Sequence, residues 1–209
     1  MRYPQPHEPT VLLVPGLHGS GPDHWQSVWE RKHPVYRRVI QADWDTPCLD
    51  RWVRRLDETI RANGRPVLLV AHSFGCLVAV RQTALDTRKI LGVLLVAPAN
   101  PDKFDATWLL PIRPLGVPTV VVGSENDRWM PIICAEWWAR RWGSRFVNAG
   151  AAGHINVDSG HGPWSAGEAL LDELKRTIRG GVRSAEAHRP LVHAASNDGF
   201  IVGVAGSRK

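Results

Sequence analysis

The chain has 209 residues, of which 44% are hydrophobic and 22% are charged, close to the averages of globular proteins. This length favours one domain with some surplus, and the composition argues against collagen, coiled coil or wholesale disorder. The net charge of +6 suggests polyanionic partners only weakly, because no Lys/Arg run exceeds two residues and aromatic residues do not interleave with a basic stripe. We expect no nucleic-acid partner.

The longest apolar runs suit buried strands and are too short to span a membrane; they cover residues 11–15, 67–71 and 92–97. The first nine residues contain no apolar signal-peptide core. The cysteines are scattered and odd in number, which predicts neither a disulfide framework nor a zinc site; they are Cys48, Cys76 and Cys134. We therefore expect a cytoplasmic protein that binds no membrane and no metal.

Strand and helix patterns alternate along the first half of the chain. Residues 10–15 form a run of apolar and β-branched residues typical of a strand buried on both faces. After a loop rich in Gly and His, residues 23–32 suit a short helix and residues 37–42 a more exposed strand. Residues 48–63 repeat apolar side chains at intervals of three and four, which predicts a helix ended by Gly64.

The alternation continues in the second half. Strands are predicted at residues 66–71, 91–97, 117–123 and 145–148, and helices at residues 74–85, 131–142 and 166–179. Such a pattern implies parallel strands joined by right-handed crossovers, so we expect a three-layer α/β/α sandwich with a mostly parallel sheet. Functional sites on such sheets lie at the carboxyl ends of the strands.

Composition also suggests the domain limits. We expect residues 1–9 to be an N-terminal extension and residues 10–180 to form the folded domain. Residues 181–209 offer Gly, Ser, Ala and single charges without a sustained period, which predicts a flexible tail. An isolated strand at residues 200–204 is the one element that this tail suggests.

The most informative segment places a serine between a buried strand and a helix. It reads Ala71-His72-Ser73-Phe74-Gly75 and matches a nucleophile elbow, with Ala71 in place of the usual first glycine. Small residues are needed there because large side chains two residues from the serine would clash across the sharp turn. The helix that follows directs N–H groups toward negative charge that grows on a bound carbonyl oxygen. We predict that Ser73 is a catalytic nucleophile instead of an ordinary loop serine.

A nucleophilic serine needs a base and an acid that orients the base, and on this kind of sheet the chain order is Ser, acid, His. The polar loop after the strand at residues 117–123 contains Asp127, which is our choice for the acid. Glu125 is its nearest rival, and Asp102 and Asp105 are outside candidates.

His154 is the predicted base, because it follows a glycine just beyond the last strand. His161 is its rival but lies one loop further on. His72 is expected to point away along the elbow, and His18 and His24 either line a pocket or make surface hydrogen bonds.

An oxyanion hole needs two backbone donors, one after the nucleophile and one after the first core strand. Phe74 supplies the first, and Leu17 supplies the second, with His18 as the alternative. The glycines around Leu17 also suggest a phosphate cradle, but neither GxGxxG nor GxxxxGK[ST] occurs. We therefore expect no nucleotide and no other cofactor.

Tryptophan is unusually frequent, with ten residues in the chain. Trp44, Trp108 and Trp129 follow predicted strands, so they are candidates for the wall of an apolar acyl pocket, with His18 beside them. The alternative for each tryptophan is a packing role.

Together these segments resemble the small serine hydrolases grouped around retinoblastoma-binding protein 9, a branch of the α/β-hydrolase superfamily. The likeness covers about residues 10–179 and rests on four blocks in order: Pro15-Gly16-Leu17-His18-Gly19-Ser20-Gly21-Pro22-Asp23-His24-Trp25-Gln26, Ala71-His72-Ser73-Phe74-Gly75, Gly123-Ser124 with Asp127, and Gly153-His154-Ile155-Asn156 followed by Ser159-Gly160 and Trp164. It implies a compact hydrolase without a large lid domain that uses Ser73, His154 and Asp127. Arg128 departs from the proline that many members have after the acid, and the segment after Gly180 has no obvious counterpart.

We therefore expect hydrolysis of a carboxylic ester, or a related acyl bond, in a small-molecule substrate through an acyl-enzyme. Amide, thioester and peroxide acceptors fit the same residues. The alternative from another class is a non-enzymatic module that binds a protein through the loop tryptophans or the tail. An intact triad favours the enzyme, because a binding module has no need for all three groups.

Overall fold

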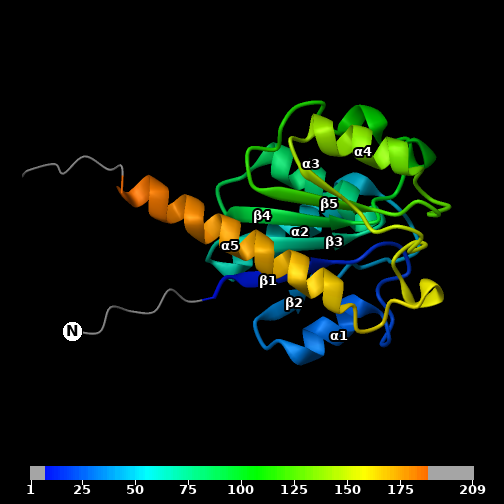
Figure 1. Cartoon of the computed structure of the whole chain (residues 1–209), viewed down its shortest axis with the longest axis horizontal. Helices are drawn as coiled ribbons and strands as arrows, with labels where there is room; N and C mark the ends of the chain where they lie inside the picture. The colour runs from blue at the N-terminus through cyan, green and yellow to red at the C-terminus, as the bar shows by residue number, and fades with distance from the viewer. Residues whose placement is uncertain (1–7, 188–209) are drawn as a thin grey trace, which may run out of the picture.

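The computed structural model describes residues 8–187, which form a six-stranded sheet with helices on both faces (Figure 1). The strand order is β2-β1-β3-β4-β5-β6, and every neighbouring pair is parallel. The strands are β1 Thr10–Val14, β2 Tyr36–Arg38, β3 Val67–His72, β4 Ile90–Val96, β5 Thr119–Gly123 and β6 Arg145–Asn148. The expected three-layer α/β sandwich with a parallel sheet is confirmed.

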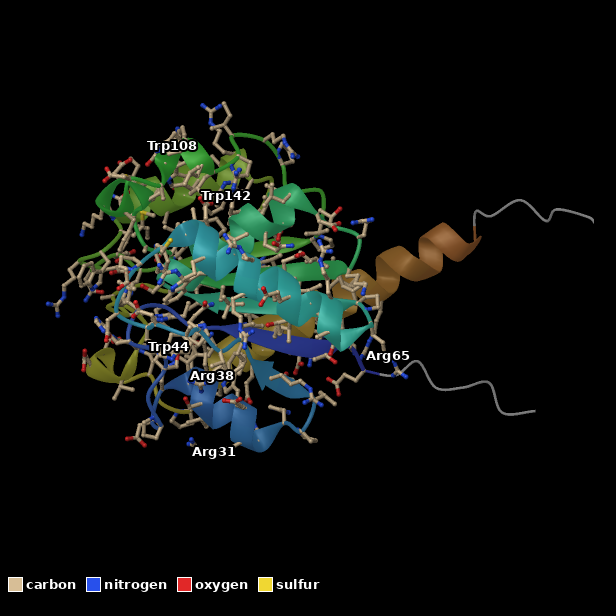
Figure 2. All side chains as sticks on the ribbon, turned by 180° about the vertical axis from the view of Figure 1, so that it is seen from behind. Arg31, Arg38, Trp44, Arg65, Trp108 and Trp142 are labelled. Carbon is tan, nitrogen blue, oxygen red and sulfur yellow. The ribbon has the colours of Figure 1, made fainter. Side chains whose placement is uncertain are left out.

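Residues 8–187 also contain five α-helices and three short 3₁₀ helices, of which η3 and α5 follow the last strand. They are α1 Trp25–Lys32, α2 Leu49–Asn63, α3 Phe74–Leu85, α4 Ile132–Arg141 and α5 Ser165–Ala187, with η1 Pro101–Phe104, η2 Thr107–Leu109 and η3 Val157–Ser159. Helix α5 crosses one face of the sheet in Figure 1, and α2 and α3 cover the face seen in Figure 2. None of the described helices is both long and apolar enough to cross a membrane.

The sheet separates two hydrophobic cores, and alternate residues of each strand face one core or the other. On β1 and β3, Leu12 and Leu69 pack with α2, α3 and α4, whereas Leu13 and Val70 pack with α1 and α5. All six residues of β3 are buried, as expected for a central strand covered on both faces. Ser73 follows the last residue of this buried strand directly.

The structure differs from the sequence prediction mainly at the last helix. Helix α5 continues through Gly180 and Gly181 to Ala187, although each interior glycine costs a helix about 1 kcal/mol relative to alanine. The rest of the predicted tail, with its strand at residues 200–204, lies outside the described residues, as do residues 1–7. Glu8, in the predicted N-terminal extension, accepts a 2.8 Å hydrogen bond from Lys175 Nζ of α5.

Candidate active site

Ser73 occupies the sharp turn between β3 and α3. Its φ of 53° and ψ of −124° lie in a region that residues other than glycine rarely adopt. Two glycines allow β1 and the chain after it to approach this turn. A Cβ atom on Gly75 would lie 2.2 Å from the carbonyl oxygen of Val14, and one on Gly16 would lie 2.7 Å from Ser73 Cβ. Close backbone contact therefore holds the serine at the carboxyl edge of the sheet.

Two hydrogen bonds connect Ser73 through His154 to Asp127. Ser73 Oγ lies 2.9 Å from His154 Nε2, and His154 Nδ1 lies 2.8 Å from Asp127 Oδ2. A carboxylate only accepts hydrogen bonds, so Nδ1 carries the proton and Nε2 accepts from the serine hydroxyl. The Asp127 side chain is 1% exposed and that of His154 is 11% exposed, so little water competes for these bonds. The structure thus brings the three residues together.

The loops after β5 and β6 are tied to each other by side-chain hydrogen bonds. Ser124 Oγ accepts from the Ala152 N–H at 2.9 Å, and Asn126 Oδ1 accepts from the Gly153 N–H at 2.6 Å. Asp127 itself accepts from the Trp129 N–H at 2.9 Å. These bonds fix the loop that carries the acid against the loop that carries the histidine.

The rival residues have other partners. Glu125 accepts a 2.8 Å hydrogen bond from Asn148, and His161 Nδ1 lies 3.2 Å from Ser159 Oγ. Asp102 accepts from the Thr107 hydroxyl, and Asp105 follows η1 in the left-handed region. Among the described residues, none of these four hydrogen-bonds to His154 or Ser73.

Two further histidines lie behind His154. His72 Nε2 donates to the His154 carbonyl oxygen at 2.9 Å, and the His72 and His154 ring centroids are 4.9 Å apart. Burial, with the nearby histidines, lowers the pKa of His72 well below its usual value. Burial, helped by Arg38 and His154, lowers the pKa of His24 to about 4. Both rings are therefore neutral at neutral pH and add no positive charge beside His154.

The sequence analysis did not anticipate the contact of His72 with His154 or the burial of His24. His72 does not simply point away along the elbow, because it bonds to the main chain of His154. His24 is buried and caps α1, where its Nδ1 accepts from the Gln26 N–H at 3.2 Å. Adjacency of His72 to Ser73 was the one available signal, and no spacing rule connects it to residue 154.

The two predicted backbone donors face no protein acceptor in the part of the chain that the structure describes. Leu17 N–H lies in the loop after β1, and Phe74 N–H is the first of α3. The His18 N–H, our alternative, already donates to the Trp44 carbonyl at 2.9 Å. Of the three candidate donors, Leu17 and Phe74 therefore keep an N–H group without a protein acceptor among the described residues.

The model of the serine hydrolase family matches residues 11–173. This chain belongs to that family. No match was found among the curated proteins.

Solved structures agree with the family match. A Pectobacterium atrosepticum protein described as a YdeN-like hydrolase is 41% identical, with 81% of this chain and 91% of that chain covered and a TM-score of 0.79. The ydeN gene product of B. subtilis is 17% identical, with 81% and 100% covered and a TM-score of 0.66. A monoacylglycerol lipase from Paleococcus ferrophilus is 14% identical, with 79% and 95% covered and a TM-score of 0.61. The last two similarities concern the fold alone.

Two cavities of this serine hydrolase meet at His154. The first cavity has a volume of about 260 Å³ and contains Ser73. The other residues that line only this cavity are Leu17, His18, Gly19, His24, His72, Ala99 and Phe104. The second cavity has a volume of about 350 Å³, and the residues that line only this cavity are Asn126, Arg128, Gly153 and Ser159. Their shared wall consists of Trp129, His154, Asn156 and Asp158. Within residues 8–187, no three His, Cys, Asp or Glu side chains gather in an arrangement that holds a metal ion.

The loop tryptophans fall into two groups. Trp129 lines both cavities and remains 44% exposed. Trp44 lines neither, because it packs edge-on against Trp52 with ring centroids 5.6 Å apart. Trp108 also lines neither; it lies on η2 at the surface (Figure 2) and is 79% exposed. Of the four predicted pocket residues, His18 and Trp129 therefore line the cavity that contains Ser73, and Trp44 and Trp108 do not.

Proposed function

We propose that this serine hydrolase cleaves carboxylic esters of small molecules through an acyl-enzyme on Ser73. The observation that carries the proposal is the unbroken line of hydrogen bonds from Ser73 Oγ through His154 to Asp127, with distances of 2.9 Å and 2.8 Å. The four sequence blocks support a place in the branch grouped around retinoblastoma-binding protein 9, and the sequence features support a cytoplasmic location.

In the first half-reaction, Ser73 Oγ attacks the ester carbonyl carbon while His154 Nε2 takes the hydroxyl proton. Asp127 keeps the proton on Nδ1 and stabilises the imidazolium that forms. The N–H groups of Leu17 and Phe74 bind the negative oxygen of the tetrahedral intermediate. His154 then gives its proton to the departing oxygen, so an alcohol leaves and the acyl group stays on Ser73.

In the second half-reaction, water takes the place of the alcohol. His154 removes a proton from the water as its oxygen attacks the acyl carbon, and a second tetrahedral intermediate forms against the same two N–H groups. Its collapse releases the carboxylic acid and returns the proton to Ser73. The neutral states of His72 and His24 assist both steps, because a second positive charge next to the imidazolium would oppose its formation.

Intact-protein mass after treatment with a fluorophosphonate tests the nucleophile directly. We expect one adduct on the wild type, none on Ser73→Ala, and an unchanged adduct on Ser165→Ala, a control at an exposed serine. Ser73→Ala is expected to lower kcat/KM on short-chain phenyl esters by about a thousandfold or more. A folded wild type without an adduct contradicts the proposal and favours a non-enzymatic protein-binding role.

A further inference from the structure

The two cavities differ in the chemistry of the walls that they do not share. Leu17, Ala99 and Phe104 give the Ser73 cavity apolar surface beside its imidazoles. The other cavity has no apolar side chain of its own, because Asn126, Arg128, Gly153 and Ser159 are all polar or lack a side chain. The two sides of the active site therefore favour different parts of a substrate.

Acyl transfer decides which part of an ester enters which cavity. His154 Nε2 must protonate the departing oxygen, so the leaving group lies on the side of the imidazole. The second cavity is lined by His154 but not by Ser73, whereas the first is lined by both residues. This difference favours the second cavity for the leaving group and the first cavity, which contains Ser73, for the acyl group.

The second cavity contains a cation without a partner. Within residues 8–187, the Arg128 guanidinium makes no hydrogen bond and no ion pair, although its carbonyl oxygen accepts from Lys103 Nζ at 3.2 Å. Lys103 Nζ lies 4.9 Å from the Trp129 ring centroid, so a second positive charge stands at the same rim. Asp158, on the shared wall, is the one carboxylate among the residues that line this cavity, and it forms no ion pair with Arg128.

Asn126 adds a neutral donor to the same wall. Its Oδ1 accepts from the Gly153 N–H at 2.6 Å and from Ser124 Oγ at 3.0 Å, which fixes the orientation of the amide. The Nδ2 group then has no acceptor among the described residues, and the side chain lines the cavity. A planar guanidinium and an amide N–H together suit a carboxylate or another oxyanion.

We infer that the second cavity is the leaving-group subsite and that it favours esters whose alcohol or phenol part carries an anionic group, held by Arg128. This inference rests on the proposed function, because it requires acyl transfer at Ser73. Arg128 is a specificity-determining residue that touches the departing part of the substrate, away from the bond that breaks.

The test compares two esters that share the acetyl group, phenyl acetate and 4-acetoxybenzoate, which differ by a carboxylate on the leaving phenol. The readout is the ratio of kcat/KM for the anionic ester to that for the neutral ester. Arg128→Ala is expected to lower this ratio about fivefold, the size of an exposed ion pair, and Asp158→Asn to raise it about twofold. Both changes should shrink at 1 M salt.

Arg31→Ala is the matched control, because Arg31 is an exposed arginine on α1 that donates to the Pro22 carbonyl (Figure 2). It should leave the ratio unchanged. If neither acetate is turned over by a protein that reacts with the fluorophosphonate, the two phenol products are tested as competitors of that probe, and the ratio of their inhibition constants replaces the kcat/KM ratio as the readout.

The outcomes separate the two levels of the proposal. A wild type that takes no adduct and cleaves neither ester overturns the proposed function and the subsite with it. A wild type that reacts, with an Arg128→Ala variant whose ratio equals that of the wild type, overturns the subsite alone. A ratio that falls equally in Arg31→Ala reduces the effect to overall surface charge and also overturns it.

Discussion

Ser73 and His154 form one hydrogen bond, yet different forces position them. The elbow around Ser73 is held by close packing, since β3 is buried along its whole length and α3 follows without a break. His154 lies in an irregular loop held by polar contacts from Asn126, Ser124 and His72. Steric positioning demands small residues at fixed places, whereas polar positioning depends on partners that lie far away in the chain.

The largest effect on activity is expected from Asp127→Asn, which changes the polar contacts that position His154. The amide would present an N–H to His154 Nδ1 and favour the tautomer that cannot accept the Ser73 proton. We expect kcat to fall by about 10³–10⁴-fold, or about 4–5 kcal/mol, while the thermal unfolding midpoint changes little. Steady-state ester hydrolysis and a melting curve measure the two quantities.

Asp102→Asn is the matched control for this change, because Asp102 lies on η1 and bonds to Thr107 instead of His154. Equal losses in the two variants would mean that the pairing of His154 with Asp127 has no special role.

The next largest effect is expected from Gly75→Ala, which tests the close packing around the elbow of Ser73. The added Cβ would lie 2.2 Å from the Val14 carbonyl oxygen and 2.5 Å from that of Pro15, and both are backbone atoms that cannot rotate away. We expect a loss of about 3 kcal/mol in the free energy of unfolding, because β1 and the elbow must separate. Urea denaturation measures it.

Gly21→Ala serves as its control, since a Cβ there meets nothing within 4 Å. A Gly75→Ala protein as stable as this control would show that the elbow can relax, and that packing does not fix Ser73.

This contrast explains how much of the hydrolase was predictable. Ser73 and its neighbours follow from steric rules that leave small residues at set positions, and Asp127 and His154 follow from chain order along alternating strands. The walls of the cavities were not predictable in the same way. Trp44 and Trp108 follow strands as Trp129 does, but the direction of a loop side chain has no period in the sequence.

The smallest of these effects is expected from the buried histidines, His24 and His72. His72 also connects the elbow to the loop of His154 through its hydrogen bond to the His154 carbonyl oxygen. The pKa of His24 is lowered to about 4 in the folded protein, so the unfolded chain binds more protons between about pH 4 and pH 6.5. Stability therefore falls as the pH drops through this window, by about 2 kcal/mol between pH 7 and pH 5 for His24 alone. His72 acts in the same direction.

His24→Asn isolates this contribution, because asparagine keeps a side-chain cap for α1 but does not titrate. Urea denaturation at pH 7 and pH 5 should show a smaller loss of stability in the variant than in the wild type, by about 2 kcal/mol. Identical losses in the two proteins would show that His24 already titrates normally in the folded state.

The backbone angles of Ser73 affect the stability of the folded protein. A φ of 53° with a ψ of −124° is comfortable for glycine and costs a residue with a side chain about 1–3 kcal/mol. Folding and chemistry therefore make opposite demands at position 73. Glycine would relieve this strain but has no nucleophilic side chain, so the turn keeps a strained residue for the sake of its hydroxyl.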